Sequence, residues 1–362
     1  MNIRTYIFIA LAVLLLALVI FLTVKKLPSK KALRILIKIL LSVAIVVFAL
    51  GAIIFPDLNP ISTTGKYKFE SATYQIEDTS RIDEYNTNIN RKLSILAYYP
   101  IKTDKNCPLV VFSHGGISFK TSNISLFREL ASHGYIVLSI DHTYQAIHTE
   151  IDGKTISMDS NFRKEVMGEN SHTDINNSFK CYQKWFSVRI KDMDFTINDA
   201  LSKKQSGYEF FKNIDENKIV LSGHSLGGAT AYGVARKRKD IKAVVALESP
   251  YLADIIGIDG NDFIWNETDY DCAMLNIYSD SGISLVENDH KYAQNKRYFK
   301  HTDKVDYCYI EGSNHYTLTD LVRSSPLLCQ ALGGGYSLSG SESLKIINEK
   351  TLNFLNNVIL NN

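Results

Sequence analysis

Residues 218–230 read Lys-Ile-Val-Leu-Ser-Gly-His-Ser-Leu-Gly-Gly-Ala-Thr, and this stretch carries the strongest local signal for the fold. The apolar run 218–222 predicts a buried strand, and the Ala-rich segment after Ser225 predicts a helix. Gly223 and Gly227 flank the serine in the pattern Gly-x-Ser-x-Gly, which between a strand and a helix is typical of a nucleophile elbow. Small residues at both positions keep a sharp, strained turn free of clashes. We therefore expect Ser225 to stand exposed at the end of a strand as a nucleophile.

A serine hydroxyl is a weak nucleophile until a neighbouring base takes its proton. In proteins with such an elbow, the base is a histidine that follows both the nucleophile and an acid in the chain. His315 meets this requirement, because it follows the strand candidate 305–310 and a short turn. His142 also follows a strand candidate but precedes Ser225, and His224 is too close to the nucleophile to point back at it. The sequence therefore predicts His315 as the base.

Two carboxylates compete for the role of the acid that orients the histidine. Glu248 follows the strand candidate 242–247, and Asp280 follows the strand candidate 273–278. Both lie between Ser225 and His315 in the chain, and both stand at carboxyl ends of strands, where open α/β sheets place their sites. The residue pattern leaves the two alternatives open.

An oxyanion formed by attack of Ser225 needs two backbone donors. The first is the amide of Leu226, which stands at the start of the helix after the nucleophile. The second is expected in a loop after an early strand. Ser113-His114-Gly115-Gly116 follows such a strand, and Gly116 allows the backbone to approach a substrate closely.

Around these motifs, apolar runs alternate with longer helical stretches. This alternation predicts an α/β fold with a mostly parallel central sheet and helices on both faces. The long polar stretch 143–172 is expected to be an irregular insertion near the site, with the character of a lid. The further strand candidates are 93–99, 108–113 and 135–140, and the helix candidates are 122–132, 177–203, 226–238, 316–324 and 342–358.

The first 58 residues predict a membrane anchor of two transmembrane helices, at about 6–24 and 36–55. The segment between them, 25–38, carries six basic residues and no acid. Positively charged loops stay in the cytoplasm, so we expect the remainder of the chain on the extracytoplasmic side of the cell membrane. A cleaved signal peptide is the alternative for the first apolar run. Residues 59–91 then form a linker and a first strand, and residues 92–362 form the catalytic domain.

Composition narrows the class of protein. The chain has 362 residues, of which 45% are hydrophobic and 22% charged, as in globular proteins. Seven of its 40 basic residues but only one of its 38 acidic residues lie in residues 1–58, so the remainder has a net charge of −4 and offers no basic surface for nucleic acid. The five cysteines show no Cys-x-x-Cys, and no His-x-x-x-His occurs. We therefore expect no metal and no cofactor.

Several stretches resemble the platelet-activating-factor acetylhydrolase family, the lipoprotein-associated phospholipase type of α/β-hydrolase. They are 108–142, with Val-Val-Phe-Ser-His-Gly-Gly and Glu-Leu-Ala-Ser-His-Gly-Tyr-Ile-Val; 214–248, with Gly-His-Ser-Leu-Gly-Gly-Ala-Thr; and 312–320, with Gly-Ser-Asn-His. The resemblance implies that Glu248 rather than Asp280 is the acid, although the family has aspartate there. It also implies oxyanion donors at Gly116 and Leu226 and a metal-free reaction.

The resemblance further implies cleavage of short or oxidised acyl chains from phospholipids. Family members are typically secreted or lipid-associated, so the N-terminal hairpin departs from the pattern. The leading hypothesis is a serine ester hydrolase that acts through an acyl-enzyme on lipid or ester substrates. A general carboxylesterase or lipase, a polyester-active hydrolase and a peptidase share the same triad. A catalytically inactive, membrane-anchored scaffold on the same fold is the alternative of another class.

Overall fold

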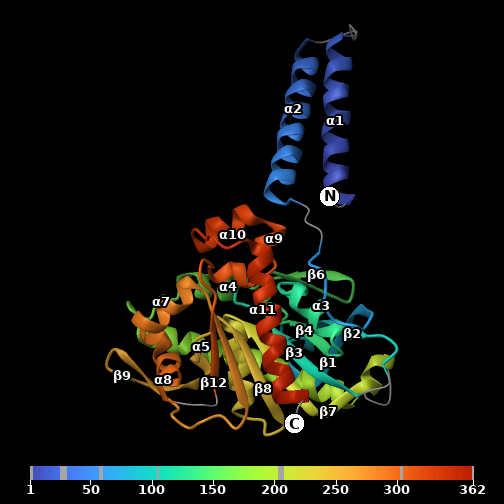
Figure 1. Cartoon of the computed structure of the whole chain (residues 1–362). Coiled ribbons are helices and arrows are strands. Elements are labelled where there is room, and N and C mark those ends of the chain that lie inside the picture. Colours follow the sequence, from blue (N-terminus) through green and yellow to red (C-terminus); the bar gives the residue numbers. More distant parts are fainter. Residues whose placement is uncertain are drawn as a thin grey trace.

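The protein consists of a pair of N-terminal helices and an α/β domain (Figure 1). The computed structural model describes residues 3–24, 31–56, 60–103, 106–202, 208–301 and 305–360. In Figure 1 the helix pair stands out from one end of the α/β domain, at the end where α9 (Leu321–Ser324) and α10 (Pro326–Gly333) lie.

An eight-stranded sheet forms the centre of the α/β domain, in the order β1-β2-β4-β3-β7-β8-β11-β12. The pairs β1–β2 and β2–β4 are antiparallel, and all further neighbours are parallel. The predicted mostly parallel sheet is therefore present. The bounds are β1 Phe69–Ile82, β2 Asn90–Pro100, β3 Cys107–Ser113, β4 Ile136–Asp141, β7 Ile214–His224, β8 Ile241–Leu247, β11 Ala273–Tyr278 and β12 Val305–Tyr309.

Helices cover both faces of the sheet, which explains the continuous apolar runs of its strands. Successive side chains of a strand point to opposite faces. In β3, Leu109 and Val111 join the apolar layer under α5 (Ile175–Ser202) and α6 (Leu226–Ala235). Val110 and Phe112 join the opposite layer under α3 (Ile124–Ser132) and α11 (Gly340–Leu355). A strand buried on both faces is therefore apolar along most of its length.

Residues 143–172 are more regular than expected. They contain the hairpin β5 (His148–Ile151) and β6 (Lys154–Ser157), followed by helix α4 (Ser160–Gly168). Asp159 caps α4, because its side chain accepts hydrogen bonds from the amides of Asn161 and Phe162. The polar composition that suggested an irregular segment instead reflects turn and cap residues and the exposed face of a short hairpin.

Several short elements lie outside the expected helices and strands. The expected helix 316–324 is divided into η5 (His315–Leu318) and α9 (Leu321–Ser324), because the backbone is extended at Thr319. The other additions are η2 (Glu209–Asn213), η3 (Leu252–Asp254), β9 (Ile255–Asp259), β10 (Asp262–Trp265), α7 (Asp280–Asn288), η4 (His290–Tyr292), α8 (Ala293–His301) and α10 (Pro326–Gly333), while η6 (Asn356–Leu360) covers the end of the expected helix 342–358. Elements of this length carry too few turns for a clear periodic signal.

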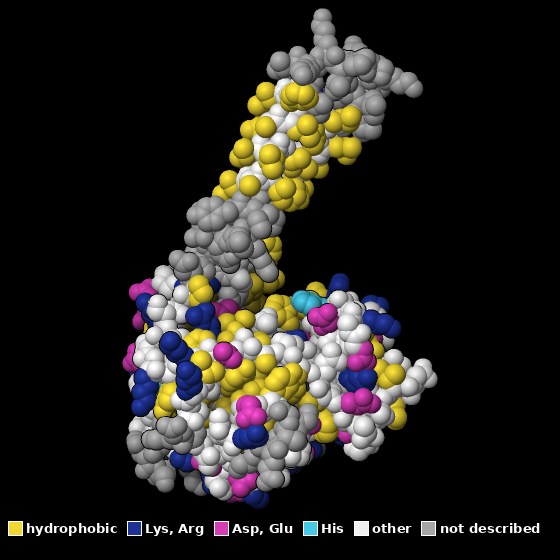
Figure 2. Space-filling view, turned by 90° about the vertical axis from the view of Figure 1, so that its right-hand side faces the viewer, with side chains coloured by type: hydrophobic (Ala, Val, Ile, Leu, Met, Phe, Trp, Pro, Cys, Tyr) yellow, Lys and Arg dark blue, Asp and Glu magenta, His cyan; other side chains and the backbone are white. Residues whose placement is uncertain are grey.

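The N-terminal helices are α1 (Ile3–Val24) and α2 (Lys31–Ile54), and they run side by side (Figure 1). Hydrophobic side chains cover their described parts in Figure 2. Among the described residues, one stretch, Ile37–Ile54, is long and apolar enough to cross a membrane, and Ile9–Phe21 is a shorter apolar stretch. Residues 25–30 of the expected basic loop 25–38 lie outside the described residues, and residues 31–38 belong to α2. Ser325 Oγ, at the start of α10, donates to the carbonyl of Ile54 at 2.6 Å.

Candidate active site

Ser225 occupies a sharp turn between β7 and α6. Its backbone has φ 53° and ψ −124°, a conformation that non-glycine residues rarely adopt. Two hydrogen bonds hold it there: the amide of Ser225 donates to the carbonyl of Leu247 at 2.8 Å, and Ser249 Oγ donates to the carbonyl of Ser225 at 2.6 Å. Backbone strain of this kind persists only where the surroundings impose it, and it is common at active sites.

The glycines around Ser225 are required by close backbone contacts. A Cβ on Gly223 would lie 2.3 Å from the carbonyl carbon of Gly227, and a Cβ on Gly227 would lie 1.9 Å from the carbonyl oxygen of Ser113. These distances exclude any side chain. The start of α6 therefore rests directly against the end of β3, which brings Leu226 next to the loop 114–116.

His315 and Glu248 are joined by a hydrogen bond. His315 Nδ1 donates to Glu248 Oε1 at 2.8 Å. Glu248 is buried, and its φ of 46° turns the side chain out of β8 toward the histidine. Ser279 holds the other carboxylate oxygen through its hydroxyl and through its amide at 3.0 Å, and Ser281 Oγ donates to Oε1 at 3.0 Å. The carboxylate is thus fully satisfied and fixed in position.

A glycine provides the space for the long glutamate side chain. A Cβ on Gly282 would lie 2.7 Å from the carboxyl carbon of Glu248. Any larger residue at the start of α7 would displace the carboxylate from His315. Nothing in the sequence pattern indicated this role of Gly282, because it belongs to a different strand–helix unit from Glu248.

Asp280, the alternative acid, has other partners. Its side chain is exposed, and its Oδ1 accepts from Tyr309 Oη at 2.8 Å and from the amide of Gly312 at 3.0 Å. The amide of Asp280 also donates to the carbonyl of Ser313 at 3.2 Å. Asp280 therefore ties the end of β11 to the turn that precedes His315, and it is Glu248 that contacts the imidazole.

The electrostatics of the pair favour an ionised glutamate. Burial alone raises the pKa of a carboxyl group, but His315 and the hydrogen bonds from Ser279 outweigh it and lower the pKa of Glu248 to about 2. His224 stays neutral, since burial and the adjacent His315 lower its pKa to about 3. Its Nε2 donates to the carbonyl of His315 at 3.0 Å, which fixes the backbone of His315 beside the elbow.

The amides of Gly116 and Leu226 lie at the same end of the sheet. A Cβ on Gly116 would lie 3.7 Å from Cδ2 of Leu226, so the two residues are neighbours. Within the described residues, neither amide donates to a protein acceptor. The same Cβ would lie 3.0 Å from Cγ1 of Val166, so α4 lies over this loop. Two unbonded amides beside a serine can bind an oxyanion.

A buried polar network supports the loop, and sequence reasoning missed it. His142 Nδ1 donates to Asp192 at 3.0 Å, and Ser113 Oγ donates to His142 Nε2 at 2.8 Å. All three side chains are fully buried, so this Ser–His–Asp constellation is inaccessible to a substrate. Arg91 neutralises Asp192 with two hydrogen bonds, of 3.1 and 2.7 Å. Burial and the nearby Arg189 lower the pKa of His142 to about 4, so it is a neutral structural group.

Known proteins share this architecture. A mixed sheet with a serine at a strand–helix elbow is characteristic of α/β hydrolases. The ferulic acid esterase from Streptomyces cinnamoneus superposes with a TM-score of 0.60 at 18% identity, covering 83% of this chain and 93% of that chain, which shows a shared fold. The family "Platelet-activating factor acetylhydrolase, isoform II" matches residues 86–361. The chain belongs to this family.

Individual relatives match over parts of their length. The platelet-activating factor acetylhydrolase of Canis lupus familiaris is 28% identical over 166 residues, which cover 41% of this chain and 36% of that protein. The platelet-activating factor acetylhydrolase of Cavia porcellus is 21% identical over 273 residues, which cover 71% of this chain and 58% of that protein. Cutinase 2 of Thermobifida cellulosilytica is 27% identical over 150 residues, which cover 41% and 42%. The matches thus span 36% to 58% of these two acetylhydrolases.

The low pKa of Glu248 makes a prediction about acid stability. The ordinary value is 4.5 and the folded value is about 2, so the ionised carboxylate stabilises the fold above about pH 4.5. This contribution is lost as the pH falls through about 2. Glu248→Gln should therefore have a lower free energy of unfolding than the wild type at pH 7, by an amount that shrinks between pH 4.5 and 2.

Urea unfolding followed by tryptophan fluorescence measures this difference, because both tryptophans lie in the α/β domain. Asp280→Asn is the matched control, since it removes an exposed carboxylate from the same end of the sheet. A difference for Glu248→Gln that stays constant from pH 7 to pH 3 would contradict the assignment.

Proposed function

We propose that the protein is a serine ester hydrolase that works through an acyl-enzyme. The observation that carries the proposal is the hydrogen-bonded pair of His315 and Glu248 beside an elbow serine with two unbonded amides. Membership of an acetylhydrolase family and the resemblance to Cutinase 2 support ester hydrolysis as the reaction class.

In the proposed mechanism Ser225 Oγ attacks the ester carbonyl carbon while His315 Nε2 takes its proton. The amides of Gly116 and Leu226 bind the negatively charged oxygen of the tetrahedral intermediate. His315 then gives the proton to the leaving alcohol, and an acyl-enzyme remains. Water attacks this ester in the same way, with His315 again as base, and the acid product leaves with Ser225 restored.

Glu248 is the acid in this proposal, and Asp280 is not. The hydrogen bond from Nδ1 to Glu248 leaves Nε2 of His315 as the basic nitrogen. The ionised carboxylate also stabilises the imidazolium that forms after proton transfer. The exposed Asp280 keeps the turn before His315 in place through Gly312 and Tyr309.

The proposed substrates are short-acyl phospholipids or related lipid esters at a membrane. The apolar helix end at Ile54 contacts Ser325 of α10, and the next turns of α10 expose Leu327, Leu328 and Leu332. Cys329 on the opposite side of α10 contacts the Asn314 side chain, next to His315. A lipid next to the membrane anchor would thus lie beside α10, which contacts the residue that precedes the proposed base.

The proposed anchor comprises both N-terminal helices, with the catalytic domain on the extracytoplasmic side. The apolar stretch Ile37–Ile54 supports one span. The second span, at about 6–24, and the orientation rest on the apolar run and on the basic residues between the helices. An inactive scaffold is disfavoured by the intact serine, histidine and carboxylate. A polyester or soluble ester substrate is the alternative that Cutinase 2 suggests.

Substitution of the proposed triad gives a direct test. Ser225→Ala and His315→Ala should lower kcat for p-nitrophenyl acetate by several orders of magnitude. Thermal unfolding should be little changed in Ser225→Ala, whereas His315→Ala should unfold at a lower temperature because it leaves the buried Glu248 carboxylate without its partner. Ser225→Ala should also abolish labelling by a fluorophosphonate probe. Glu248→Gln should lower kcat strongly, because the ionised partner of the imidazole is lost, whereas Asp280→Asn should retain most activity. Full activity in Ser225→Ala would refute the mechanism.

The exposed leucines of α10 test the proposed lipid substrate. Leu332, 60% exposed, is replaced by glutamate. We expect slower hydrolysis, by about tenfold, of a short-acyl phosphatidylcholine in vesicles, because a charge opposes contact with the bilayer. Hydrolysis of water-soluble p-nitrophenyl acetate should be unchanged. Ile256→Glu, which changes a leucine-sized side chain that is 63% exposed in β9, is the control. An unchanged rate on vesicles would argue for a soluble ester, and equal loss with both substrates would show that Leu332→Glu damages the catalytic domain rather than its contact with the bilayer.

A further inference from the structure

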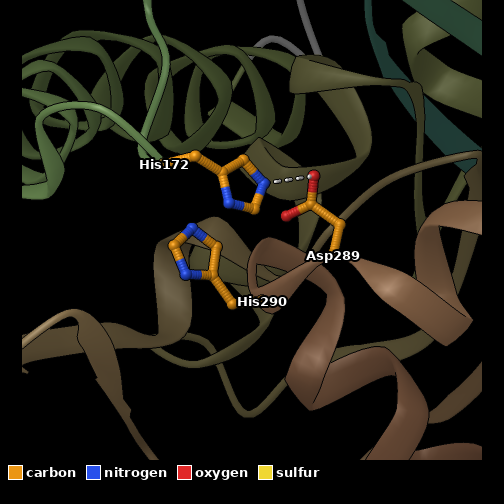
Figure 3. Close-up of side chains that lie close together, drawn as sticks. All are labelled: His172, Asp289 and His290. Atoms are coloured by element: carbon orange, nitrogen blue, oxygen red, sulfur yellow. Dashed lines mark ion pairs between the residues drawn. The ribbon is translucent and has the colours of Figure 1, made fainter.

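A cluster of two histidines and a carboxylate lies outside the candidate active site. His172 stands between α4 and α5, while Asp289 and His290 join α7 to η4. Figure 3 shows the two imidazole rings face to face, with the carboxylate beside His172. The ring centroids are 4.5 Å apart, and His172 Nε2 lies 3.4 Å from Asp289 Oδ2. One nitrogen or oxygen of each residue lies within 4.8 Å of the other two.

We propose that these three side chains bind a zinc ion. Two imidazoles and a carboxylate are ligands that Zn²⁺ takes, with a water in the fourth position. Zinc–ligand bonds of about 2.0–2.1 Å place tetrahedral ligand atoms roughly 3.4 Å apart. The side chains must therefore close in by about an ångström, and the parallel rings must tilt so that their lone pairs converge. The His172 side chain is 56% exposed, so it has the room to rotate.

The surroundings of the cluster favour a cation. A surface cavity of about 440 Å³ adjoins it, and the carboxylates of Asp174 and Asp262 line its wall. Ser171 Oγ lies 2.7 Å from His290 Nε2, and the amide of Lys291 donates to Asp289 Oδ1 at 2.8 Å. These contacts orient the ring and the carboxylate in the way that neighbours of metal ligands do.

Zinc at this place would join two segments that are distant in the chain. Glu169, directly after α4, is already paired with Lys291 at 3.6 Å, and Tyr182 Oη donates to Glu169 at 2.6 Å. A metal bond from His172 adds a further tie just beyond the end of α4. Because Val166 of α4 lies over Gly116, the metal site would help to hold α4 above the loop. The site is structural and takes no part in the reaction.

Calorimetric titration of the untagged full-length protein in detergent with ZnCl₂ tests the site. We expect one Zn²⁺ per chain, no binding of MgCl₂, and a higher midpoint of thermal unfolding with zinc. His172→Ala and His290→Ala should each weaken zinc binding by at least about tenfold. Asp289→Asn keeps the cap on η4 and should weaken it as well. His148→Ala, which removes an exposed histidine elsewhere, should bind as the wild type does.

Absence of saturable zinc binding would overturn the proposal. Unchanged affinity in both His172→Ala and His290→Ala would do the same, because the zinc would then be bound elsewhere. Thermal unfolding without zinc shows that each variant is folded, and the exposed position of His172 makes loss of the fold in its variant unexpected.

A second and independent observation concerns Arg189 of α5. Its side chain is fully buried. Nη1 donates to the carbonyl of His114 at 2.7 Å, Nη2 donates to the carbonyl of Gly115 at 3.3 Å, and Nε donates to Gln145 Oε1 at 2.7 Å. Burial lowers the pKa of Arg189 to about 9, which leaves it cationic at neutral pH.

We infer that Arg189 is a positioning residue for the oxyanion donor at Gly116, an inference that rests on the proposed function. In a trans peptide the carbonyl and the following amide point in opposite directions. Because the carbonyl of Gly115 faces Arg189, the amide of Gly116 points away from Arg189. The guanidinium thereby fixes two consecutive peptides with one rigid fork.

The test separates transition-state stabilisation from folding. Arg189→Met should lower kcat for p-nitrophenyl acetate by about 10- to 100-fold with KM little changed, and Arg189→Lys should restore part of kcat. The affinity for an alkyl boronic acid, which forms a tetrahedral adduct on serine, should fall in parallel. Circular dichroism and thermal unfolding show whether each variant folds. If Arg189→Met does not fold, the kcat and boronic acid affinity of Arg189→Lys decide the test.

A change in KM without a change in kcat would overturn the role of Arg189. A folded variant that binds the boronic acid as tightly as the wild type does would overturn it as well. Such a result leaves the proposed function intact as long as the wild type hydrolyses the ester and Ser225→Ala does not. If the wild type is inactive, the proposed function itself fails.

Discussion

The approach of α6 to the end of β3 is the constraint on which the rest of the site depends. At Gly227 the helix backbone lies so close to the Ser113 carbonyl that a Cβ would be 1.9 Å away. This contact limits the angle at which the chain leaves β7, and together with the hydrogen bonds to Leu247 and Ser249 it holds Ser225 at its strained φ of 53°. It also brings the first amide of α6 beside the loop after β3. One steric contact thus places both the serine and the pair of unbonded amides.

The histidine, its carboxylate and the serine that holds the carboxylate follow three neighbouring strands of the sheet. Glu248 follows β8 and His315 follows β12. Ser279 follows β11, the strand between these two, and donates to the Glu248 carboxylate. The glutamate is one methylene longer than an aspartate, and the absence of a side chain at Gly282 accommodates the difference. A glutamate at position 248 therefore requires a glycine at position 282, because a side chain there would occupy the space of the carboxylate.

Behind the loop 114–116 the interior is polar. The Ser113, His142 and Asp192 side chains form a buried chain of hydrogen bonds, and Arg91 and Arg189 bring positive charge to it. Buried charges are costly unless they are paired and bonded, so such a network holds one geometry firmly. We interpret it as the support that keeps the loop carbonyls turned inward and the loop amides turned toward the elbow.

Elements whose signals are local could be predicted from the residue pattern alone. The apolar runs gave the strands of a mostly parallel sheet, and Gly-x-Ser-x-Gly between a strand and a helix gave the elbow at Ser225. Chain order singled out His315, because few histidines follow a strand in the last part of the domain. Short elements such as α10 and the hairpin β9–β10 gave no comparable periodic signal.

Which groups meet across the sheet depends on the packing of the whole domain. Glu248 and Asp280 have the same local setting, each at the end of a strand, and only the direction of their side chains separates them. Arg189 is 75 residues from His114, and His172 is paired with residues more than 100 positions later. Contacts of this kind depend on how helices and loops pack over the ends of strands, and a pattern read along one chain carries no record of that packing.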